Sequence, residues 1–407
     1  MPPDGPPLPA QPAYLRRLRS ALDAAPAAPA EPAALSAAAV ELLAETFGEE
    51  ATSERVASMP AYVALSGEHT HYFEGFALLL RLPAGAAVAV RAAPEARVAV
   101  RWGGRPVEVR PIAPTRTRGA DTPELLARLL HALRERLDGE LSFEAAVVAP
   151  VPDCREALLG AVAAAAVEAV AALGGAALDA EAAVRHGAAA AQEALGHPYG
   201  PAHLLAAQSA APLALVDAAT LEWEALEPPE DLAWGLVDTG VHRSPGRAAA
   251  WERVQVLREA VAWLQRGGLP DLRSLRELEH RDVPQALGTL FGTPKRVVRH
   301  VVGEDRRVPR LVTALRKGDA QVLGALLLMS QASLRADWQA STDEVEHVVA
   351  AAEEADGIYG ARMTGGGYGG CVLVVGRPFL LPGFLDATAA AFAARFGRRP
   401  PTLVVSS

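Results

Sequence analysis

The 407 residues are 50% hydrophobic, which is enough for about two domains with buried cores. The net charge of −9 argues against a nucleic-acid partner, and every long apolar run is broken by charges, Pro or Gly, which argues against a membrane span. No basic-then-apolar segment opens the chain, so no secretory signal is expected. Two cysteines, Cys154 and Cys371, are too few for a disulfide framework or a zinc cluster, so a reducing cytoplasm is expected.

In chain order, a Pro- and Ala-rich tail of 34 residues comes first, and we expect it to be partly disordered, with a short helix at Tyr14–Ala24. Apolar residues at helical spacing predict a helix at Leu35–Phe47. Thr122 is predicted as the N-cap of a further helix, with Pro123 at its first position. Later helices are predicted at Val308–Arg316, Gln321–Ala336 and Glu344–Glu354. Strands are predicted at Ala61–Leu65, Ala87–Arg91, Arg97–Arg101, Leu213–Val216, Ala233–Val237, Cys371–Val375 and Pro401–Val405.

A polar segment follows the first predicted strand, and residues 66–75 read Ser-Gly-Glu-His-Thr-His-Tyr-Phe-Glu-Gly. Glu68 and His69 offer a carboxylate and an imidazole, which are suited to hydrogen bonds with sugar hydroxyls. On residue types alone, a Glu-His pair is more often a solvated surface feature.

An alanine-rich helix is predicted to follow Asp153. Asp153 and Glu156 have the spacing of a capping box, in which side-chain carboxylates occupy the free N–H groups of the first turn. Carboxylates in that position would repel a bound triphosphate.

The last third of the chain contains five glycines within six positions, at Gly365–Gly367, Gly369 and Gly370. Because glycine tolerates positive φ and permits close approach, such a loop is suited to wrapping a ligand or a second domain. A flexible turn between two strands is the alternative. The loop is not a Walker A motif, since the Gly-Lys-Ser/Thr ending is absent.

Residues 362–371, Arg-Met-Thr-Gly-Gly-Gly-Tyr-Gly-Gly-Cys, resemble the C-terminal signature of the galactokinases, which belong to the GHMP small-molecule kinase superfamily. The strings at Arg299–Val302, Ala332–Arg335 and Gly357–Gly360 agree with it. The polar segment at 66–75 resembles the sugar-binding signature of the same family.

The resemblance implies an α+β fold with a GHMP kinase domain at residues 35–200, a second at residues 201–407 and a cleft between them. It implies ATP-dependent phosphorylation of galactose at the anomeric hydroxyl, with ATP and Mg²⁺ as cofactors. The substrate-binding positions that it implies are Glu68, His69, His71 and Gly200. The nucleotide-binding positions that it implies are Gly160, Gly365, Gly366 and Gly367.

Several positions depart from the family pattern. Tyr62 stands where the family has an arginine close to the reacting groups, and His71 and His203 stand where it has two aspartates. Three serines that bind phosphate and Mg²⁺ in the family are replaced by Val162, Ala163 and Ala164.

These replacements predict impaired or absent catalysis, because phosphoryl transfer depends on positioning and electrostatic stabilisation. We therefore interpret the chain as a galactokinase-like pseudoenzyme that binds galactose or another small sugar, or a protein partner, and serves carbohydrate metabolism. Two alternatives stay open: a sugar kinase with a rebuilt site around Tyr62 and His203, and a structural partner without a small ligand. No metal site is predicted.

Overall fold

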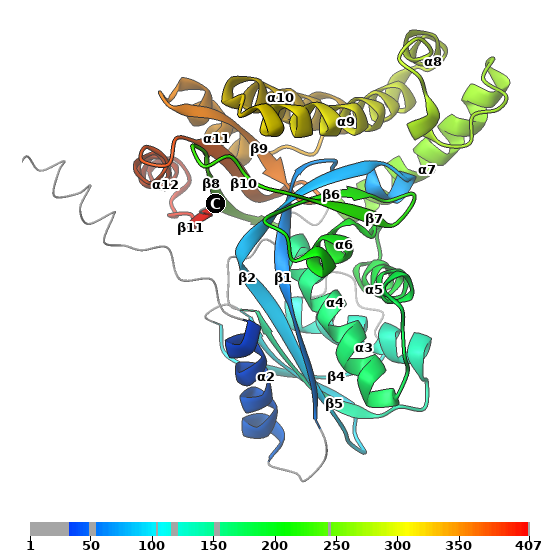
Figure 1. Ribbon diagram of the computed structural model, residues 1–407, viewed down its shortest axis with the longest axis vertical. Helices are drawn as coiled ribbons and strands as arrows, with labels where there is room; N and C mark the ends of the chain where they lie inside the picture. Colours follow the sequence, from blue (N-terminus) through cyan, green and yellow to red (C-terminus); the bar gives the residue numbers. More distant parts are fainter. Residues whose placement is uncertain are drawn as a thin grey trace, which may run out of the picture.

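The computed structural model describes residues 32–48, 54–102, 105–114, 121–149, 155–242 and 246–405. The predicted helix at Tyr14–Ala24, most of the N-terminal tail and Asp153 of the capping pair lie outside these ranges. The described chain contains helices and two β-sheets, so the predicted α+β class is confirmed (Figure 1).

The longer helices and the strands alternate irregularly along the chain. The helices are α2 (Pro32–Phe47), α3 (Thr122–Leu137), α4 (Arg155–Gly174), α5 (Ala180–Leu195), α6 (Ala202–Ser209), α7 (Gly246–Arg266), α8 (Val283–Thr289), α9 (Gly292–Lys317), α10 (Ala320–Ser333), α11 (Asp343–Glu354) and α12 (Leu381–Phe396). The strands are β1 (Arg55–Ser66), β2 (Phe76–Ala92), β3 (Arg97–Trp102), β4 (Glu108–Pro111), β5 (Phe143–Ala149), β6 (Leu213–Asp217), β7 (Glu222–Leu226), β8 (Ala233–His242), β9 (Ile358–Thr364), β10 (Gly369–Gly376) and β11 (Thr402–Val405). Short helical turns are η1 (His71–Phe73), η2 (Leu275–Glu277) and the π-helical η3 (Leu334–Trp338).

The first sheet has the strand order β4-β3-β5-β2-β6-β7, and β1 pairs antiparallel with β2. Alternate residues of its strands face opposite layers of helix, as strand geometry requires. Ala87 and Ala89 of β2 pack against α2 on one face, whereas Val88 and Val90 join the core that contains α4 on the other. In Figure 1, α2 lies on one side of this sheet and α3, α4 and α5 lie on the other.

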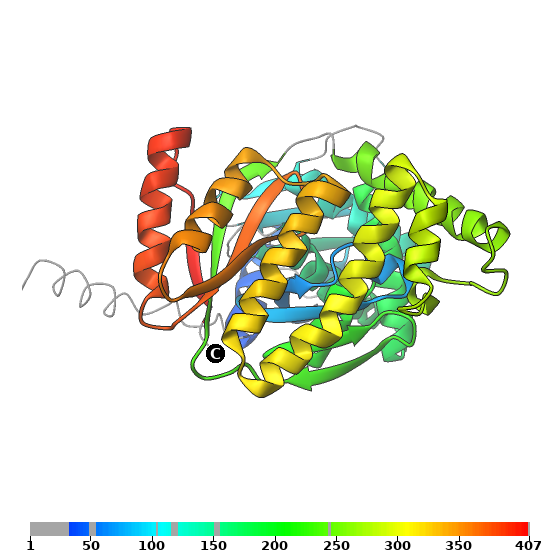
Figure 2. The same ribbon diagram turned by 90° about the horizontal axis from the view of Figure 1, so that it is seen from above.

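The second sheet is antiparallel, with the order β11-β8-β10-β9. Figure 2 shows α9 and α10 side by side over the molecule as seen from above, and α12 at one end. The backbones of α10 and β9 come into direct contact at Gly324 and Gly360. A Cβ on Gly324 would lie 1.9 Å from the carbonyl oxygen of Tyr359, so only glycine permits this approach.

The α4 helix forms a large part of the core of the first domain. Residues Ala157–Gly174 are long and apolar enough to cross a membrane by composition, but 78% of that segment is buried inside the protein. Among the described residues no other helix has this character. The burial shows that α4 serves as a core helix, because its small side chains allow β1 and β2 to pack closely against it.

Two predictions need correction. The N-cap of α3 is Asp121 rather than Thr122, and its carboxylate accepts a hydrogen bond from the Glu124 N–H. The helix predicted at Val308–Arg316 is only the end of α9, which passes through Pro309 without stopping. The first sheet also includes β6 and β7 and so extends to Leu226, and the predicted domain boundary at residue 200 stays a prediction.

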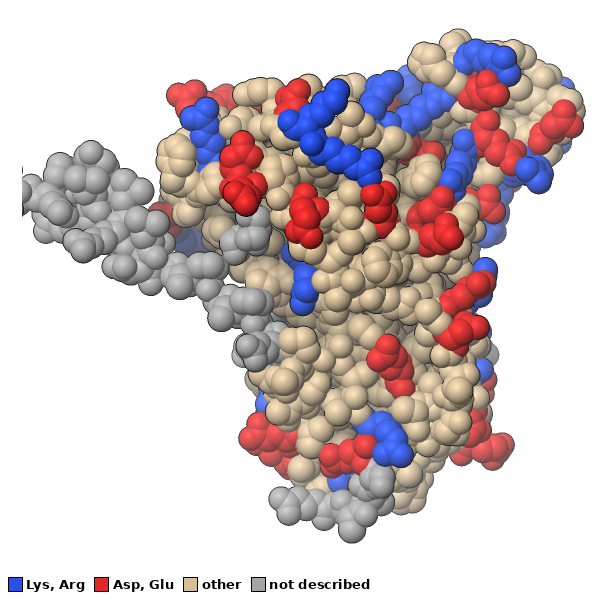
Figure 3. Space-filling view, in the orientation of Figure 1, with Lys and Arg blue, Asp and Glu red and all other residues tan. Residues whose placement is uncertain are grey.

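Charged side chains of both signs are interspersed on the face seen in Figure 3. They are most numerous over the upper part of the molecule, where α7, α8 and α9 lie. The middle of the same face, over α4 to α6, is largely uncharged.

Candidate functional site

The polar segment that follows β1 is a tight loop with little exposed surface. Gly67 has φ +94°, and a Cβ there would lie 2.4 Å from the Phe76 carbonyl oxygen. Thr70 closes the loop, because its Oγ1 donates to the carbonyl oxygens of Gly67 and Phe76 at 2.8 and 2.7 Å. As a result Glu68 and His69 are only 5% and 4% exposed, so they are not a solvated surface pair.

Glu68 joins this loop to the glycine-rich loop. Its Oε1 accepts a hydrogen bond from the Gly365 N–H at 2.5 Å and lies 3.5 Å from Nη2 of Arg362. Burial raises the pKa of Glu68 to about 6, although the Arg362 charge and the Gly365 N–H oppose the rise. The structure therefore brings together two residues predicted separately for sugar and for nucleotide.

A buried carboxylate that was not predicted, Glu304 of α9, supports this contact. It has no exposed surface and accepts hydrogen bonds from Ser66 Oγ at 2.6 Å and the Gly67 N–H at 3.0 Å. It also pairs with Arg307 at 2.7 Å and with Arg362 at 3.4 Å. Burial alone would raise the pKa of Glu304, but these two guanidinium charges hold it well below its usual range.

A sequence signal for Glu304 exists. The residue lies on the apolar face of α9, at i+3 from Val301 and i−4 from Val308, and both valines are buried. A charged residue inside an apolar stripe indicates either a buried ion pair or a functional group. The predicted helix began at Val308, and so this pattern was missed.

His69 points into the second domain. It has φ +68°, which is uncommon for a residue other than glycine, and its ring stacks on Trp338 with 4.1 Å between centroids. Its Nδ1 is hydrogen-bonded to the Tyr72 hydroxyl. Its Nε2 is buried and has no partner among the described residues. Burial lowers the pKa of His69 well below its ordinary value, and the neighbouring His300 adds to the shift.

His71 and His203 come together although they are far apart in the sequence. Their ring centroids are 6.1 Å apart in an edge-to-face arrangement, and Nδ1 of each is buried without a partner in the described part of the chain. Burial lowers the pKa of His71 to about 3, with a smaller contribution from His203, and lowers the pKa of His203 to about 4. Both rings are therefore neutral near pH 7.

Two glycines make room for these rings. A Cβ on Gly200 would lie 2.2 Å from Nδ1 of His71, and a Cβ on Gly160 would lie 2.5 Å from Cβ of His203. Gly160 lies within α4 and faces His203 and Tyr199. Its predicted role in nucleotide binding stays a prediction.

Tyr62 takes no part in this cluster in any described contact. It is 1% exposed, and its hydroxyl donates to the Ala211 carbonyl oxygen at 2.5 Å. Burial raises the pKa of Tyr62. Its side chain is thus held by the segment after α6, and it offers no charge in place of the arginine that the resemblance leads one to expect.

The stretch of α4 that replaces the three serines is part of the core. Val162, Ala163 and Ala164 are 0%, 0% and 6% exposed and carry no hydroxyl. These residues do not fit the phosphate and Mg²⁺ ligands that the resemblance implies, because methyl groups cannot coordinate a hard cation. Within the described residues, no group of three His, Cys, Asp or Glu side chains is arranged to hold a metal ion.

The glycine-rich loop packs against its own chain. Gly365, Gly367, Gly369 and Gly370 all have positive φ, and Gly366 does not. A Cβ on Gly367 would lie 2.5 Å from the Ala340 Cβ, and one on Gly369 would lie 2.0 Å from a β8 carbonyl oxygen. The predicted need for glycine is therefore confirmed at these two positions, where the close neighbour is the protein itself.

Cys371 follows this loop in β10 and is 2% exposed. Two cysteines are too few for the framework of several disulfides that stabilises some small proteins, but Cys371 is disulfide-bonded. Cys154, the only other cysteine in the sequence, lies outside the described residues. The cytoplasmic location stays a proposal.

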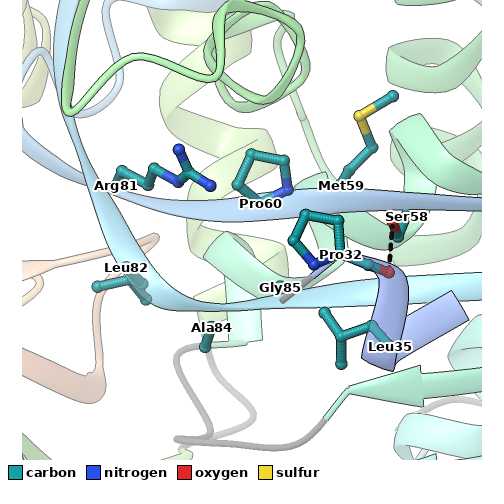
Figure 4. A pocket seen from close by; sticks show the side chains of 9 residues that line it. All are labelled: Pro32, Leu35, Ser58, Met59, Pro60, Arg81, Leu82, Ala84 and Gly85. Carbon is teal, nitrogen blue, oxygen red and sulfur yellow. Dashed lines mark hydrogen bonds between the residues drawn. The ribbon is translucent and has the colours of Figure 1, made fainter. Parts of the chain in front are cut away.

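A small pocket lies apart from this site, between the start of α2 and the neighbouring strands β1 and β2 (Figure 4). Its volume of about 20 Å³ is that of roughly one water molecule, too small for a sugar. The residues that line it are Pro32, Leu35, Ser58, Met59, Pro60, Arg81, Leu82, Ala84 and Gly85.

The fold is that of the GHMP kinases. Residues 311–395 match the family model for the C-terminal region of GHMP kinases. The chain is similar to a Lactococcus lactis galactokinase crystallised with galactose, with a TM-score of 0.75 and 22% identity over 92% of this chain and 98% of that one. It is also similar to the mevalonate kinase of L. major, with a TM-score of 0.56 and 16% identity over 87% and 98% of the two chains. The predicted two-domain GHMP architecture is thus confirmed.

The chain belongs to the galactokinase family. Residues 41–92 match the galactokinase galactose-binding signature. The galactokinase of Streptomyces coelicolor is 30% identical over 380 residues, which cover 89% of this chain and 94% of that protein. Human galactokinase is 40% identical over 122 residues, and Chloroflexus aggregans galactokinase is 35% identical over 202 residues. These two matches span 30% and 47% of this chain, and only 29% and 49% of the respective relatives.

Proposed function

We propose that this galactokinase-family chain binds a small sugar but transfers phosphate poorly or not at all, and acts as a sugar-responsive or protein-binding component of carbohydrate metabolism. The observation that carries the proposal is the buried, hydroxyl-free segment Val162–Ala164 of α4. Since serine hydroxyls are expected at these positions by family resemblance, the groups that would bind phosphate and Mg²⁺ are missing there.

The residues at the expected sugar-binding positions support the proposal that this chain binds a small sugar. Glu68, His69 and Gly200 keep the residue types of the family signature, and the structure gathers them near the domain boundary. Removal of one electrostatic contributor from a catalytic site costs about a hundred- to a thousand-fold in rate. This chain lacks the three serines, the arginine expected at position 62 and the aspartate expected at position 203. We therefore expect little turnover.

Calorimetry of the full chain with galactose, and separately with Mg-ATP, tests the proposal. We expect heat with a sugar and none with Mg-ATP, together with no steady formation of sugar phosphate in a phosphorylation assay. The Streptomyces coelicolor relative serves as the positive control for the assay. Steady turnover by this chain at an ordinary enzyme concentration would overturn the catalytic part of the proposal.

A sugar kinase with a remodelled site is the second candidate. The observation in its favour is His203, whose buried Nδ1 lacks a partner in the described chain and lies near a second imidazole. In that case the variant His203→Ala would abolish turnover, whereas it would not change the rate of an inactive protein. The assay above therefore decides between the two candidates before any variant is made.

A further inference from the structure

We propose that the sugar site recognises a hexose that carries an anionic group, a carboxylate or a phosphate, through the imidazole cluster formed by His69, His71 and His203. This inference rests on the proposed sugar-binding function and goes further by naming the chemical class of the ligand. The structural basis is a set of buried ring nitrogens that have no partner among the described residues, next to the carboxylate of Glu68, which is already paired.

The unpartnered nitrogens are the first argument. Nε2 of His69 and Nδ1 of both His71 and His203 are buried, and none has a hydrogen-bond partner among the described residues. A buried polar atom without a hydrogen-bond partner is unfavourable, and so most buried polar atoms are satisfied by protein, water or ligand. Two of these atoms belong to rings whose centroids are 6.1 Å apart, and His69 precedes His71 by two residues, so the three atoms indicate a missing partner.

His300 shows what a purely structural histidine looks like in the same region. It has no exposed surface, and both of its ring nitrogens have partners: Ser333 Oγ at 3.0 Å and the Glu68 carbonyl oxygen at 3.4 Å. The imidazole cluster lies close to His300, with 5.9 Å between the ring centroids of His69 and His300. Unlike His300, each ring of the cluster has one nitrogen without a hydrogen-bond partner among the described residues. Burial alone therefore does not explain the unpaired atoms.

The charge around the cluster is the second argument. Arg253 and Arg362 lie close enough to His69 to contribute to the lowering of its pKa, and His203 contributes in the same way to the lowered pKa of His71. Glu68, the nearest acidic residue in the loop, is engaged by Arg362 and the Gly365 N–H. Among the described residues, the carboxylate of Glu68 is therefore not free to repel an anion that enters this site.

The chemistry of imidazole is the third argument. A neutral imidazole donates from one nitrogen and accepts at the other, whereas an ionised carboxylate only accepts. With Nδ1 protonated, His71 and His203 can each donate to an anionic oxygen without any net charge. Ionised aspartates in the same places would repel a carboxylate or a phosphate.

The glycine contacts hold the rings in place for this role. His71 packs closely against Gly200, and His203 packs closely against Gly160, so both side chains are restricted by neighbouring backbone. The donors are thus fixed before a ligand arrives, which reduces the entropy cost of binding.

Calorimetry with the full chain tests the inference through three probes: galactose, galacturonate and galactose 1-phosphate, with inorganic phosphate as a fourth titration. We expect galacturonate or galactose 1-phosphate to bind more tightly than galactose by a factor of about ten or more. The galacturonate and sugar phosphate titrations distinguish the two sources of negative charge. Inorganic phosphate that binds as tightly as the sugar phosphate would overturn the inference, because the site would then be a simple anion site.

The outcomes separate this inference from the proposed function. Galactose binding as tightly as the anionic sugars would refute the anionic preference and leave sugar binding intact. No binding of any sugar would refute both. These comparisons use the unaltered protein, and so they do not depend on whether a variant folds.

A charge-reversal variant adds a second readout. In His71→Asp/His203→Asp, the ratio of the affinity for the anionic sugar to the affinity for galactose should fall by a factor of about ten or more. His186→Asp on α5, outside the cluster, is the matched control and should keep the original preference. An equal loss for neutral and anionic sugars in the double variant would count against the inference, provided that its melting temperature is unchanged.

Discussion

Glu304 of α9 and Arg362 of β9 form an ion pair with 3.4 Å between Oε1 and Nη1, although neither side chain has any exposed surface. Arg362 also donates to the Leu65 carbonyl oxygen at 2.9 Å, and Glu304 accepts from the Gly67 N–H. The pair therefore attaches the end of β1, which belongs to the first sheet, to a helix and a strand of the second domain. The position of Glu68 depends on this attachment.

Removal of the Glu304 charge should destabilise the protein strongly. Glu304→Gln leaves Arg307 and Arg362 buried without their carboxylate, and loss of one partner of a buried pair costs about 3–5 kcal/mol. Urea unfolding measures the effect. Glu224→Gln removes an exposed pair with Arg316 and should cost at most about 1 kcal/mol. Equal costs for the two variants would contradict the role assigned to the buried pair.

Substitution of Gly200 should impair ligand binding more than folding. The Cβ of Gly200→Ala would lie 2.2 Å from Nδ1 of His71, so the ring must move. We expect sugar affinity to fall about tenfold or more, with a loss of about 1–3 kcal/mol in stability from overpacking. Gly288→Ala is the control, since a Cβ there meets nothing within 4 Å. Unchanged affinity in Gly200→Ala would show that the position of His71 is irrelevant to the ligand.

The same glycine-to-alanine change should lower the stability of the protein at one helical position and raise it at another. Gly324→Ala in α10 places a Cβ 1.9 Å from the Tyr359 carbonyl oxygen and should lower stability by about 1–3 kcal/mol or more. Gly383→Ala in α12 meets nothing within 4 Å and should raise stability by up to about 1 kcal/mol through helix propensity. Thermal unfolding of both variants checks the prediction. A neutral Gly324→Ala would mean that α10 and β9 are free to separate.

Stability should fall as the pH is lowered from about 6.5 toward 4. The pKa of His203 is about 4 in the folded protein and that of His71 is about 3, both below the ordinary 6.5, so the unfolded chain binds more protons in this range. For His203 the loss amounts to about 3 kcal/mol at most. Glu68, with its pKa raised to about 6, acts in the opposite direction between about pH 6 and 4.5 and offsets part of the loss.

Urea unfolding at pH 7 and pH 5 measures this dependence. The variant His203→Asn lacks one of the buried rings whose pKa is lowered, and its stability should fall less between these pH values than that of the original protein. The exposed His280 provides a control, and His280→Asn should keep the original slope. Identical slopes in all three proteins would show that His203 does not titrate as proposed.

Much of the fold was predictable from local patterns. The strand at Ala61–Leu65, the helix at Leu35–Phe47 and the glycine-rich loop before β10 all appear in the structure, because period-2 and period-3.6 apolar spacing and positive-φ glycines act over a few residues. The absence of hydroxyls at Val162–Ala164 is likewise a matter of residue identity alone. The N-cap of α3 was misplaced by one residue, since both Asp121 and Thr122 are good caps.

The sequence by itself determined the family and the residue types of the candidate site. Only the tertiary structure showed that Glu68 accepts a hydrogen bond from the Gly365 N–H and that His71 and His203 are neighbours. It also showed that Glu304 accepts a hydrogen bond from Gly67, in the loop that carries Glu68. These contacts join residues more than a hundred positions apart, so no local propensity encodes them. They form because the packing of two sheets and their helices brings distant backbones together, and the resulting burial then decides which charges are paired and which rings stay neutral.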